Sequence, residues 1–378
     1  MQDNIDLDIF EPVARIVVIG VGGAGNNAVN RMMDEHIDKV EFYVLNTDRQ
    51  ALASSKAPHR IAIGDSVTQG LGAGGDPEKG RKSAEASADT IRDIVRGANM
   101  VFIAAGMGGG TGTGASPVVA QIAREEGALT IAIVTRPFTF EGNTRIAHSV
   151  TGLSELKDAV DSIIIVSNDK LLMSAGGARI SQAFQESDRV LAQSVKTVVD
   201  LILLPAVINL DFADVQSTLK DSGIALIGFG TGTGPTKAQD AAENAINSPL
   251  LEASISGARR AICAVTCGDN VTLYEAQECV NRIIEQAGNM IDVKFGVSIN
   301  EELDDTILVS VIASDFPAEY DFTSTPQFVM PKKDQIGHSV DETRQRTISM
   351  EQQEARETGN EEESIENQIL PDFLRGMI

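Results

Sequence analysis

Two glycine-rich segments near the amino terminus have the composition and spacing of phosphate-binding turns. The first, GVGGAG at residues 20–25, fits the GxGxxG pattern of dinucleotide-binding folds. The second, GMGGGTGTG at residues 106–114, adds the hydroxyl groups of Thr111 and Thr113. Glycines let the backbone approach phosphate oxygens, and a helix that begins in the first turn, at about Gly25, would direct its amide N–H groups at them. Two such turns at neighbouring strand ends could surround a polyphosphate, and a triphosphate fits better than a pyrophosphate.

A third glycine-rich segment, residues 70–76, precedes a helical pattern and could cover the terminal phosphate. The sequence contains no Gly-Lys dipeptide, so a P-loop of the GxxxxGK type is absent. Backbone amides and Mg²⁺ would therefore hold the phosphates in place of a P-loop lysine. We predict no metal-ligating residues, because the four histidines are scattered and neither an HExxH nor a paired-Cys motif occurs.

The elements that must position these turns alternate between strands and helices. Helical patterns cover residues 77–96 and 115–126. Short β-branched runs, which indicate buried parallel strands, begin at Arg15, Val40, Met100, Leu129 and Ser162. This β-α-β-α order predicts a doubly wound parallel sheet with its ligand at the carboxyl ends of the strands. We expect this nucleotide domain to span residues 15–178.

A long helix and a second block follow this domain. Apolar residues at steps of three and four predict one helix over residues 179–204, which Pro205 ends. Residues 205–317 then form a smaller α/β domain with a mixed sheet. Its expected strands begin at residues 223 and 258 and lie near 291–297 and 306–312, and its expected helices cover 236–247 and 273–286.

The two ends of the chain differ in composition from these domains. Residues 1–14 form an acidic segment that we expect to be flexible. Residues 318–365 are polar and read as a disordered linker. The last segment, residues 366–378, restores an apolar cluster that is too short to bury itself, so we interpret it as a docking peptide. The cluster consists of Ile369, Leu370, Phe373 and Leu374.

The overall composition excludes several classes of function. The chain has 378 residues and a formal net charge of −23, which makes nucleic acid and anionic membranes poor direct partners. Aromatic residues supply only 4% and Trp is absent, so stacking platforms for single-stranded nucleic acid are not expected. Three scattered cysteines predict buried thiols rather than disulfides. No apolar run is long enough to insert into a membrane, and we expect a cytoplasmic protein.

Taken together, the motifs of this sequence resemble the tubulin and FtsZ family of GTPases, in the form found in bacterial cell division. The resemblance covers roughly residues 10–317 and the terminal peptide. It rests on GVGGAGNNAVNRM, NTD, GGGTGTG, RPFTFEG, SNDKLL and NLDFADV, which begin at residues 20, 46, 108, 136, 167 and 209. It implies a tubulin-like α/β fold, GTP and GDP as ligands with Mg²⁺, and GTP hydrolysis.

The resemblance also implies roles for individual residues. Glu141 and Arg145 would lie beside the ribose, although an i,i+4 surface ion pair is the alternative for them. Asn168, Phe184 and Asp188 would form the base pocket, where a carboxylate can accept from the N1 and N2 donors of guanine. For Phe184, core packing is the alternative. The phosphate-binding positions are Gly22, Gly23, Ala24, Gly25, Asn26, Asn27, Gly109, Gly110, Thr111, Gly112 and Thr113.

Hydrolysis is assigned by the resemblance to Asn209, Asp211 and Asp214, with helix capping as the alternative for the two aspartates. They follow the long helix and should lie opposite the glycine loops, out of reach of the nucleotide in the same subunit. The resemblance implies that they complete the site of the next subunit in a head-to-tail filament, so that self-assembly activates hydrolysis. Such filaments would form the cytokinetic ring at midcell and recruit division adaptors through the terminal peptide.

Two other functions compete with this one. An NAD-dependent oxidoreductase could use the GxGxxG turn with Asp48 as its ribose ligand, but it leaves GGGTGTG and NLDFADV unexplained. A tubulin relative that binds GTP without turnover is the second alternative, and the presence of Asp211 and Asp214 argues against it.

Overall fold

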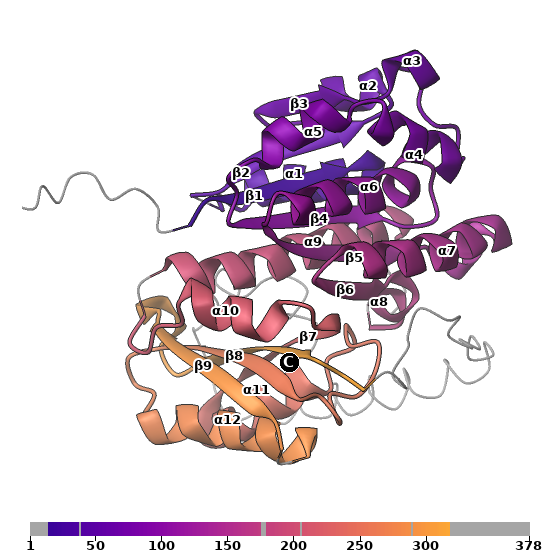
Figure 1. Cartoon of the computed structure of the whole chain (residues 1–378). Helices are drawn as coiled ribbons and strands as arrows, with labels where there is room; N and C mark the ends of the chain where they lie inside the picture. The colour runs from indigo at the N-terminus through magenta and orange to yellow at the C-terminus, as the bar shows by residue number, and fades with distance from the viewer. Residues whose placement is uncertain (1–13, 38, 175–178, 205, 289, 318–378) are drawn as a thin grey trace, which may run out of the picture. The chain divides into compact units, whose positions relative to one another are not determined.

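The computed structural model describes residues 14–37, 39–174, 179–204, 206–288 and 290–317 of the chain (Figure 1). The predicted flexible segment at 1–14, apart from Ala14, the linker at 318–365 and the docking peptide at 366–378 lie outside these residues. In spatial order the ten strands form one sheet, β3-β2-β1-β4-β5-β6-β7-β10-β8-β9. Pairing is parallel from β3 to β7 and between β8 and β9, and antiparallel where β10 lies between β7 and β8.

The strands lie where the apolar runs of the sequence predict them, with one addition. Their bounds are β1 Ile16–Val21, β2 Glu41–Asn46, β3 His59–Ala62, β4 Met100–Gly106, β5 Leu129–Arg136, β6 Ser162–Ser167, β7 Gly223–Gly232, β8 Arg260–Cys267, β9 Asp292–Ile299 and β10 Ile307–Ser314. The sequence pattern does not predict β3, because this short edge strand pairs only through β2 and exposes His59 and Arg60. His59 stacks on Tyr43 of β2 with ring centroids 4.5 Å apart.

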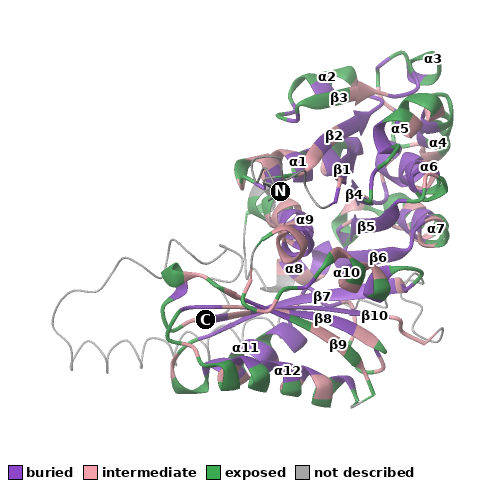
Figure 2. Cartoon of the chain, turned by 60° about the vertical axis from the view of Figure 1, so that its left-hand side comes forward, coloured by how far each residue is buried: buried purple, intermediate pink, exposed green. Residues whose placement is uncertain are grey.

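Helices cover both faces of the parallel part of the sheet. Alternate residues of β1 enter different cores: Ile16 and Val18 pack toward α1, α9 and α10, whereas Val17 and Ile19 pack toward α4, α5, α6 and α7. Figure 2 shows β1, β4 and β5 as almost wholly buried. The helices are α1 Gly22–Asp34, α2 Arg49–Ala53, α3 Asp65–Thr68, α4 Pro77–Glu85, α5 Ala88–Val95, α6 Thr111–Glu125, α7 Asn143–Ala159, α8 Asn168–Ser174, α9 Ile180–Leu203, α10 Phe212–Leu219, α11 Lys237–Ile246 and α12 Leu273–Ala287. Three short 3-10 helices cover Thr139–Glu141, Gly234–Thr236 and Glu301–Leu303.

The fold-class prediction is confirmed, and the structure adds a connection between its two parts. Besides the long helix α9, strand β7 joins them, because its first residues pair with β6 and the rest of the strand pairs with β10. A separate core lies between β8, β10 and the helices α11 and α12. It includes the three cysteines, which are free and buried as predicted.

Several helix boundaries differ from the sequence-based expectations. The pattern over residues 77–96 forms two helices, α4 and α5, with a break at Ala86 and Ser87. Helix α1 begins at Gly22, about three residues earlier than expected, and α6 begins at Thr111 rather than at residue 115. The glycines of its first turn are close-approach residues: a Cβ on Gly114 would lie only 1.8 Å from the carbonyl oxygen of Pro77 in α4. Tertiary packing thus overrides the low helix propensity of this turn.

Candidate functional site

The three glycine-rich segments come together at the carboxyl ends of the parallel strands. We call residues 20–25 loop 1, residues 106–114 loop 2 and residues 70–76 loop 3. Loops 1 and 2 follow β1 and β4, which are neighbours with Val21 opposite Ala105. They touch through backbone, because a Cβ built on Gly22 would lie 2.8 Å from the amide nitrogen of Gly112.

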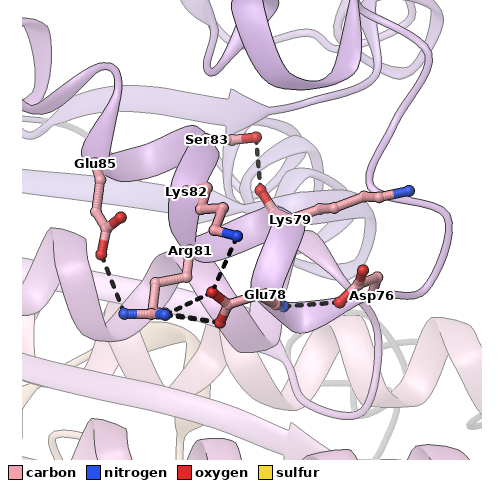
Figure 3. A network of polar contacts seen from close by, with 7 residues as sticks. All are labelled: Asp76, Glu78, Lys79, Arg81, Lys82, Ser83 and Glu85. Atoms are coloured by element: carbon pink, nitrogen blue, oxygen red, sulfur yellow. Dashed lines mark hydrogen bonds and ion pairs between the residues drawn. The ribbon is translucent and has the colours of Figure 1, made fainter.

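Loop 3 packs against loop 2 from the other side. A Cβ on Gly110 would lie 2.8 Å from the Cβ of Ala73 and 2.9 Å from the amide nitrogen of Asp76. Asp76 also begins α4, because its carboxylate accepts a hydrogen bond from the N–H of Glu78 at 3.0 Å. Exposed ion pairs within α4, in which Arg81 binds Glu78 and Glu85, lie along this helix (Figure 3).

The three loops leave open space beside some of their residues, while other residues are buried among them. A Cβ built on Gly109 would have no heavy atom of the described residues within 4 Å apart from its chain neighbours. The same holds for Gly23 once the backbone of its own helix is also set aside, and Asn27 is exposed. In contrast, Asn26 is buried, and in the orientation that satisfies its amide it donates to the carbonyl oxygen of Gly22 at 2.9 Å. Asn26 therefore shapes loop 1 from inside, while Gly23 and Asn27 border open space.

Two helix amino termini begin at this open space. The first turns of α1 and α6 carry N–H groups that have no partner within their own helices, together with the positive end of each helix dipole. Such termini fit the phosphates of a nucleotide. Thr113 holds loop 2 internally, because its hydroxyl accepts from the N–H of Gly108 at 2.8 Å and the residue is buried.

The predicted base-binding residues gather where β6 ends and α9 begins. Phe184 is 41% exposed and meets Phe138 edge to face, with ring centroids 5.0 Å apart. Asn168 is buried, and its side-chain oxygen accepts from the hydroxyl of Ser187 at 2.8 Å. Because Phe184 is 41% exposed, the core-packing alternative does not fit this residue.

Asp188 is the titratable group of this region. Burial raises the pKa of its carboxyl group from 3.8 to about 7, and Arg31 on α1 opposes the shift only in part. A desolvated carboxylate at a ligand site gains most when a ligand supplies hydrogen-bond donors. Asp188 also lies one turn after Phe184 on α9, as the sequence predicts.

Glu141 and Arg145 form the i,i+4 ion pair that was the structural alternative for them. Glu141 also accepts a hydrogen bond from the N–H of Phe138 at 2.9 Å. Its carboxylate is thus fixed between α7 and the 3-10 helix, whereas the Arg145 side chain is 56% exposed. A Cβ on Gly108 of loop 2 would lie 2.8 Å from the carbonyl oxygen of Arg145, so the pair borders loop 2.

The NLDFADV segment forms the start of α10. Asp211 caps this helix, because its carboxylate accepts from the N–H of Asp214 at 2.8 Å. Asp214 accepts in return from the N–H of Asp211 and forms an ion pair with Lys294 at 3.4 Å. The side-chain oxygen of Asn209 accepts from the N–H of Ala206 at 2.7 Å. Both aspartates therefore do cap α10, and the capping hydrogen bond uses only the Oδ1 atom of the Asp211 carboxylate.

The order of the elements places this segment near the amino ends of the parallel strands, whereas loops 1 and 2 lie at their carboxyl ends. Helix α9 starts beyond the carboxyl end of β6 and has 24 residues, so it spans about 36 Å at the usual helical rise. Helix α10 then leads into the amino end of β7, where Gly223 pairs with Ser162 at the amino end of β6 (Figure 1). The carboxylates of Asp211 and Asp214 and the glycine loops therefore lie at different ends of the same sheet.

Sequence reasoning gave no role to Asn46 in this site. This residue ends β2, and its side-chain amide donates to Asn26, the residue after loop 1, at 3.3 Å when the Asn26 amide is oriented to satisfy its hydrogen bonds. The neighbouring Asp48 caps α2 and bridges to Leu71 of loop 3. The only signal in the sequence was the NTD motif itself. Asp48 is thus occupied in capping, unlike the exposed ribose ligand that a dinucleotide enzyme requires.

The described residues hold neither a preformed metal site nor a membrane-spanning helix. Among them, no three His, Cys, Asp or Glu side chains are grouped so that they could hold a metal ion. Within the same part of the chain, none of the helices combines the length and the apolar character needed to cross a membrane.

Comparison with known proteins agrees with this geometry. The model of the Tubulin/FtsZ family GTPase domain matches residues 15–176, and that of the FtsZ family C-terminal domain matches residues 223–317. The solved structure of an empty FtsZ dimer from M. jannaschii is 40% identical, covers 80% of this chain and 88% of its own, and has a TM-score of 0.76. The chain belongs to the FtsZ family.

As an FtsZ-family protein with a tubulin-like GTPase domain, the chain binds guanine nucleotide and hydrolyses GTP. A second FtsZ structure from M. jannaschii, that of a point mutant, matches with the same identity and TM-score and with 91% of its own chain covered. The GTPγS-bound protofilament of CetZ2 from Haloferax volcanii is 20% identical, covers 87% of this chain and 99% of its own, and has a TM-score of 0.69, which supports the fold. Family membership rules out the oxidoreductase alternative, and the GTPase domain supports hydrolysis over GTP binding without turnover.

Proposed function

We propose that this FtsZ-family GTPase polymerises head to tail and that each hydrolytic site is shared by two subunits. The proposal rests on the separation of two groups of residues. Loops 1 and 2 lie at the carboxyl ends of the parallel strands, whereas Asp211 and Asp214 lie near their amino ends. A single subunit cannot bring these groups to one phosphate. Two subunits stacked in the same direction can.

Loops 1 to 3 would bind the triphosphate through the backbone amides of Gly23 and Gly109, two residues that border open space, and through the first turns of α1 and α6. Phe184 would stack on the base, Asp188 and Asn168 would recognise guanine, and Glu141 and Arg145 would lie beside the ribose. Mg²⁺ would neutralise the phosphate oxygens when bound. An ion held mainly by the nucleotide fits a site in which the described acidic residues form no metal-binding group.

Asp211, Asp214 and Asn209 of the adjoining subunit would orient the attacking water. Hydrolysis of GTP depends chiefly on positioning and electrostatics, so a fixed carboxylate is suited to this task. The capping box supplies that rigidity, because each aspartate is held by the backbone N–H of the other. In this arrangement the segment is rigid before the subunits meet.

A head-to-tail contact of this kind is heterologous and produces filaments. We assign residues 15–178 to nucleotide binding, 179–204 to the connecting helix and 205–317 to the activating domain. The filaments would form the cytokinetic ring at midcell in the cytoplasm. Recruitment of division adaptors would use the terminal peptide 366–378 on its tether 318–365, without direct membrane insertion or nucleic-acid binding.

The dependence of GTP turnover on protein concentration tests the shared site. Phosphate release per subunit should be very low for dilute monomers and should rise steeply once filaments form, as followed by light scattering on the same samples. ATP in parallel tests the base pocket. Substantial GTP turnover by protein shown to be monomeric would contradict the shared site.

A further inference from the structure

A buried pair of hydroxyl groups lies beneath the phosphate loops. Thr47 follows strand β2, and its Oγ1 lies 2.7 Å from Oγ1 of Thr111, the first residue of α6. Thr47 is 1% exposed and Thr111 is 9% exposed. Thr111 belongs to loop 2 and to the proposed phosphate site, whereas Thr47 belongs to none of the three loops.

The backbone of Thr47 is held by loop 3. Its carbonyl oxygen accepts hydrogen bonds from the N–H of Gly72 at 3.0 Å and from the hydroxyl of Thr68 at 3.3 Å. The residue before it, Asn46, pairs with Asn26, the residue that follows loop 1 in α1. The hydroxyl of Thr47 is therefore carried on a segment that contacts loops 2 and 3 and the residue next to loop 1.

The direction of the hydrogen bond between the two hydroxyls decides what Thr111 can offer to a ligand. Each hydroxyl has one proton. If Thr111 donates to Thr47, its oxygen presents only lone pairs, which repel phosphate oxygens. If Thr47 donates to Thr111, the Thr111 proton is available to a phosphate, and the two bonds strengthen each other in a site of low dielectric.

We propose that Thr47 is a positioning residue for the phosphate chain of the nucleotide. By donating to Thr111 it turns the Thr111 hydroxyl into a donor toward the bound phosphates, and through its carbonyl group it ties this donor to loop 3. The proposal rests on the nucleotide site proposed above. It assigns to the NTD motif a role in orienting a binding group rather than in touching the ligand.

The test compares Thr47→Val with Thr47→Ser in the full chain, below the concentration at which filaments form. Val keeps the shape and removes the hydroxyl, whereas Ser keeps the hydroxyl. We expect Thr47→Val to weaken GDP and GTP binding by about tenfold, the effect of losing one charge-assisted hydrogen bond. Thr47→Ser should stay close to wild type. Guanosine, which lacks phosphates, should bind all three proteins alike, whereas a general collapse of the site would weaken it as well.

A double-mutant cycle then shows whether Thr47 acts through Thr111. In the background of Thr111→Val, the Thr47→Val change should have no further effect on nucleotide affinity. Thr68→Val is the matched control: it removes the weaker of the two hydrogen bonds to the Thr47 carbonyl but keeps the bond from Gly72 and the Thr47–Thr111 pair, so nucleotide affinity should stay close to wild type. If Thr47→Val does not fold, Thr47→Ala takes its place.

Three results would overturn the proposal: wild-type affinity in Thr47→Val, a weakened affinity for guanosine of the same size, or full additivity with Thr111→Val. Each of these leaves the nucleotide site itself in place. Failure of the wild-type protein to bind GDP or GTP would instead contradict the proposed function.

Discussion

Asp211 and Asp214 hold each other in a reciprocal cap, each carboxylate accepting a hydrogen bond from the other residue's backbone N–H. The same two carboxylates are the proposed catalytic groups for a neighbouring subunit. Structure and chemistry can be separated here, because Asn is as good a helix cap as Asp but carries no charge.

We expect Asp211→Asn to keep the stability of the fold and the affinity for GTP while losing most GTP turnover. Asp211→Ala should lose turnover as well and should also lower the free energy of unfolding by about 1 kcal/mol, the usual value of a cap. Phosphate release, nucleotide binding and denaturant unfolding measure the three quantities. The shared site can then be tested by mixing Asp211→Asn with a second mutant that has a defective nucleotide site but an intact Asp211. Turnover should return at the nucleotide site of the Asp211→Asn subunit, because the second mutant supplies the carboxylate. The defective nucleotide site of the second mutant should stay inactive. Without this recovery the shared-site geometry is wrong.

The base pocket can be tested through Asp188. Asp188→Asn replaces one of two acceptors with a donor, so guanine meets a mismatched partner, and GTP affinity should fall by about 1 to 3 kcal/mol. Asp200→Asn is the matched control, since Asp200 is another carboxyl group on α9 whose pKa is raised by burial, and it pairs with Lys196 rather than facing the site. Unchanged affinity in Asp188→Asn would place this residue outside the pocket.

The pKa of about 7 at Asp188 predicts a dependence of binding on pH. The ionised form accepts the guanine donors, so GTP affinity should fall as the pH falls, by about tenfold from roughly pH 8 to roughly pH 6. Asp188→Asn should remove this component and leave the titration of the phosphates, which serves as the internal reference. A wild-type profile identical to that of Asp188→Asn would contradict the assignment.

The unliganded protein should show the opposite trend in stability. Because the folded-state pKa of Asp188 lies above its ordinary value of 3.8, its contribution to stability is fully present below that value and is lost as the pH rises through about 7. Asp188→Asn should therefore stabilise the nucleotide-free protein more at pH values above about 7 than at acidic pH. Denaturant unfolding at several pH values without nucleotide measures this difference.

Gly110 and Gly109 are adjacent but differ in their surroundings. A Cβ on Gly110 would meet Ala73 and Asp76, so Gly110→Ala should separate loops 2 and 3 and destabilise the fold by about 1 to 3 kcal/mol. A Cβ on Gly109 faces open space, so Gly109→Ala should leave the unfolding midpoint nearly unchanged while weakening GTP binding. Equal losses of stability in the two variants would show that Gly109 does not face open space, and wild-type GTP affinity in Gly109→Ala would show that this space is not a ligand site.

Truncation after Ser364 should leave GTP turnover and filament length close to wild type, because the docking peptide lies outside the matched domains. It should abolish recruitment to membrane-bound adaptors, and Phe373→Ala should weaken recruitment strongly, since burying a Phe side chain is worth about 1.5 to 3 kcal/mol. Co-sedimentation of filaments with adaptor-loaded vesicles tests both variants. Recruitment of truncated filaments at the wild-type level would move the docking surface to the folded body.

The sequence by itself predicted nine of the ten strands, the long helix and the three glycine-rich segments that we propose as phosphate loops. Continuous β-branched runs of this length favour strands covered on both faces, and apolar steps of three and four residues over 179–204 favour a helix. Glycine clusters directly after such strands have a narrow range of functions. These signals are local, so they can be read without knowledge of the fold. Strand β3 was not predicted, because it forms only by pairing with β2.

Only the tertiary structure decided which of these residues meet. Thr47 and Thr111 are 64 positions apart, and no periodicity connects them. The pKa of Asp188 is raised because the folded chain buries this side chain. The early start of α6 at Thr111 depends on the close contact between Gly114 and Pro77 of α4. Hydrogen bonds, desolvation and close backbone contacts are pairwise and short-ranged, so they exist only once the sheet has brought distant segments together.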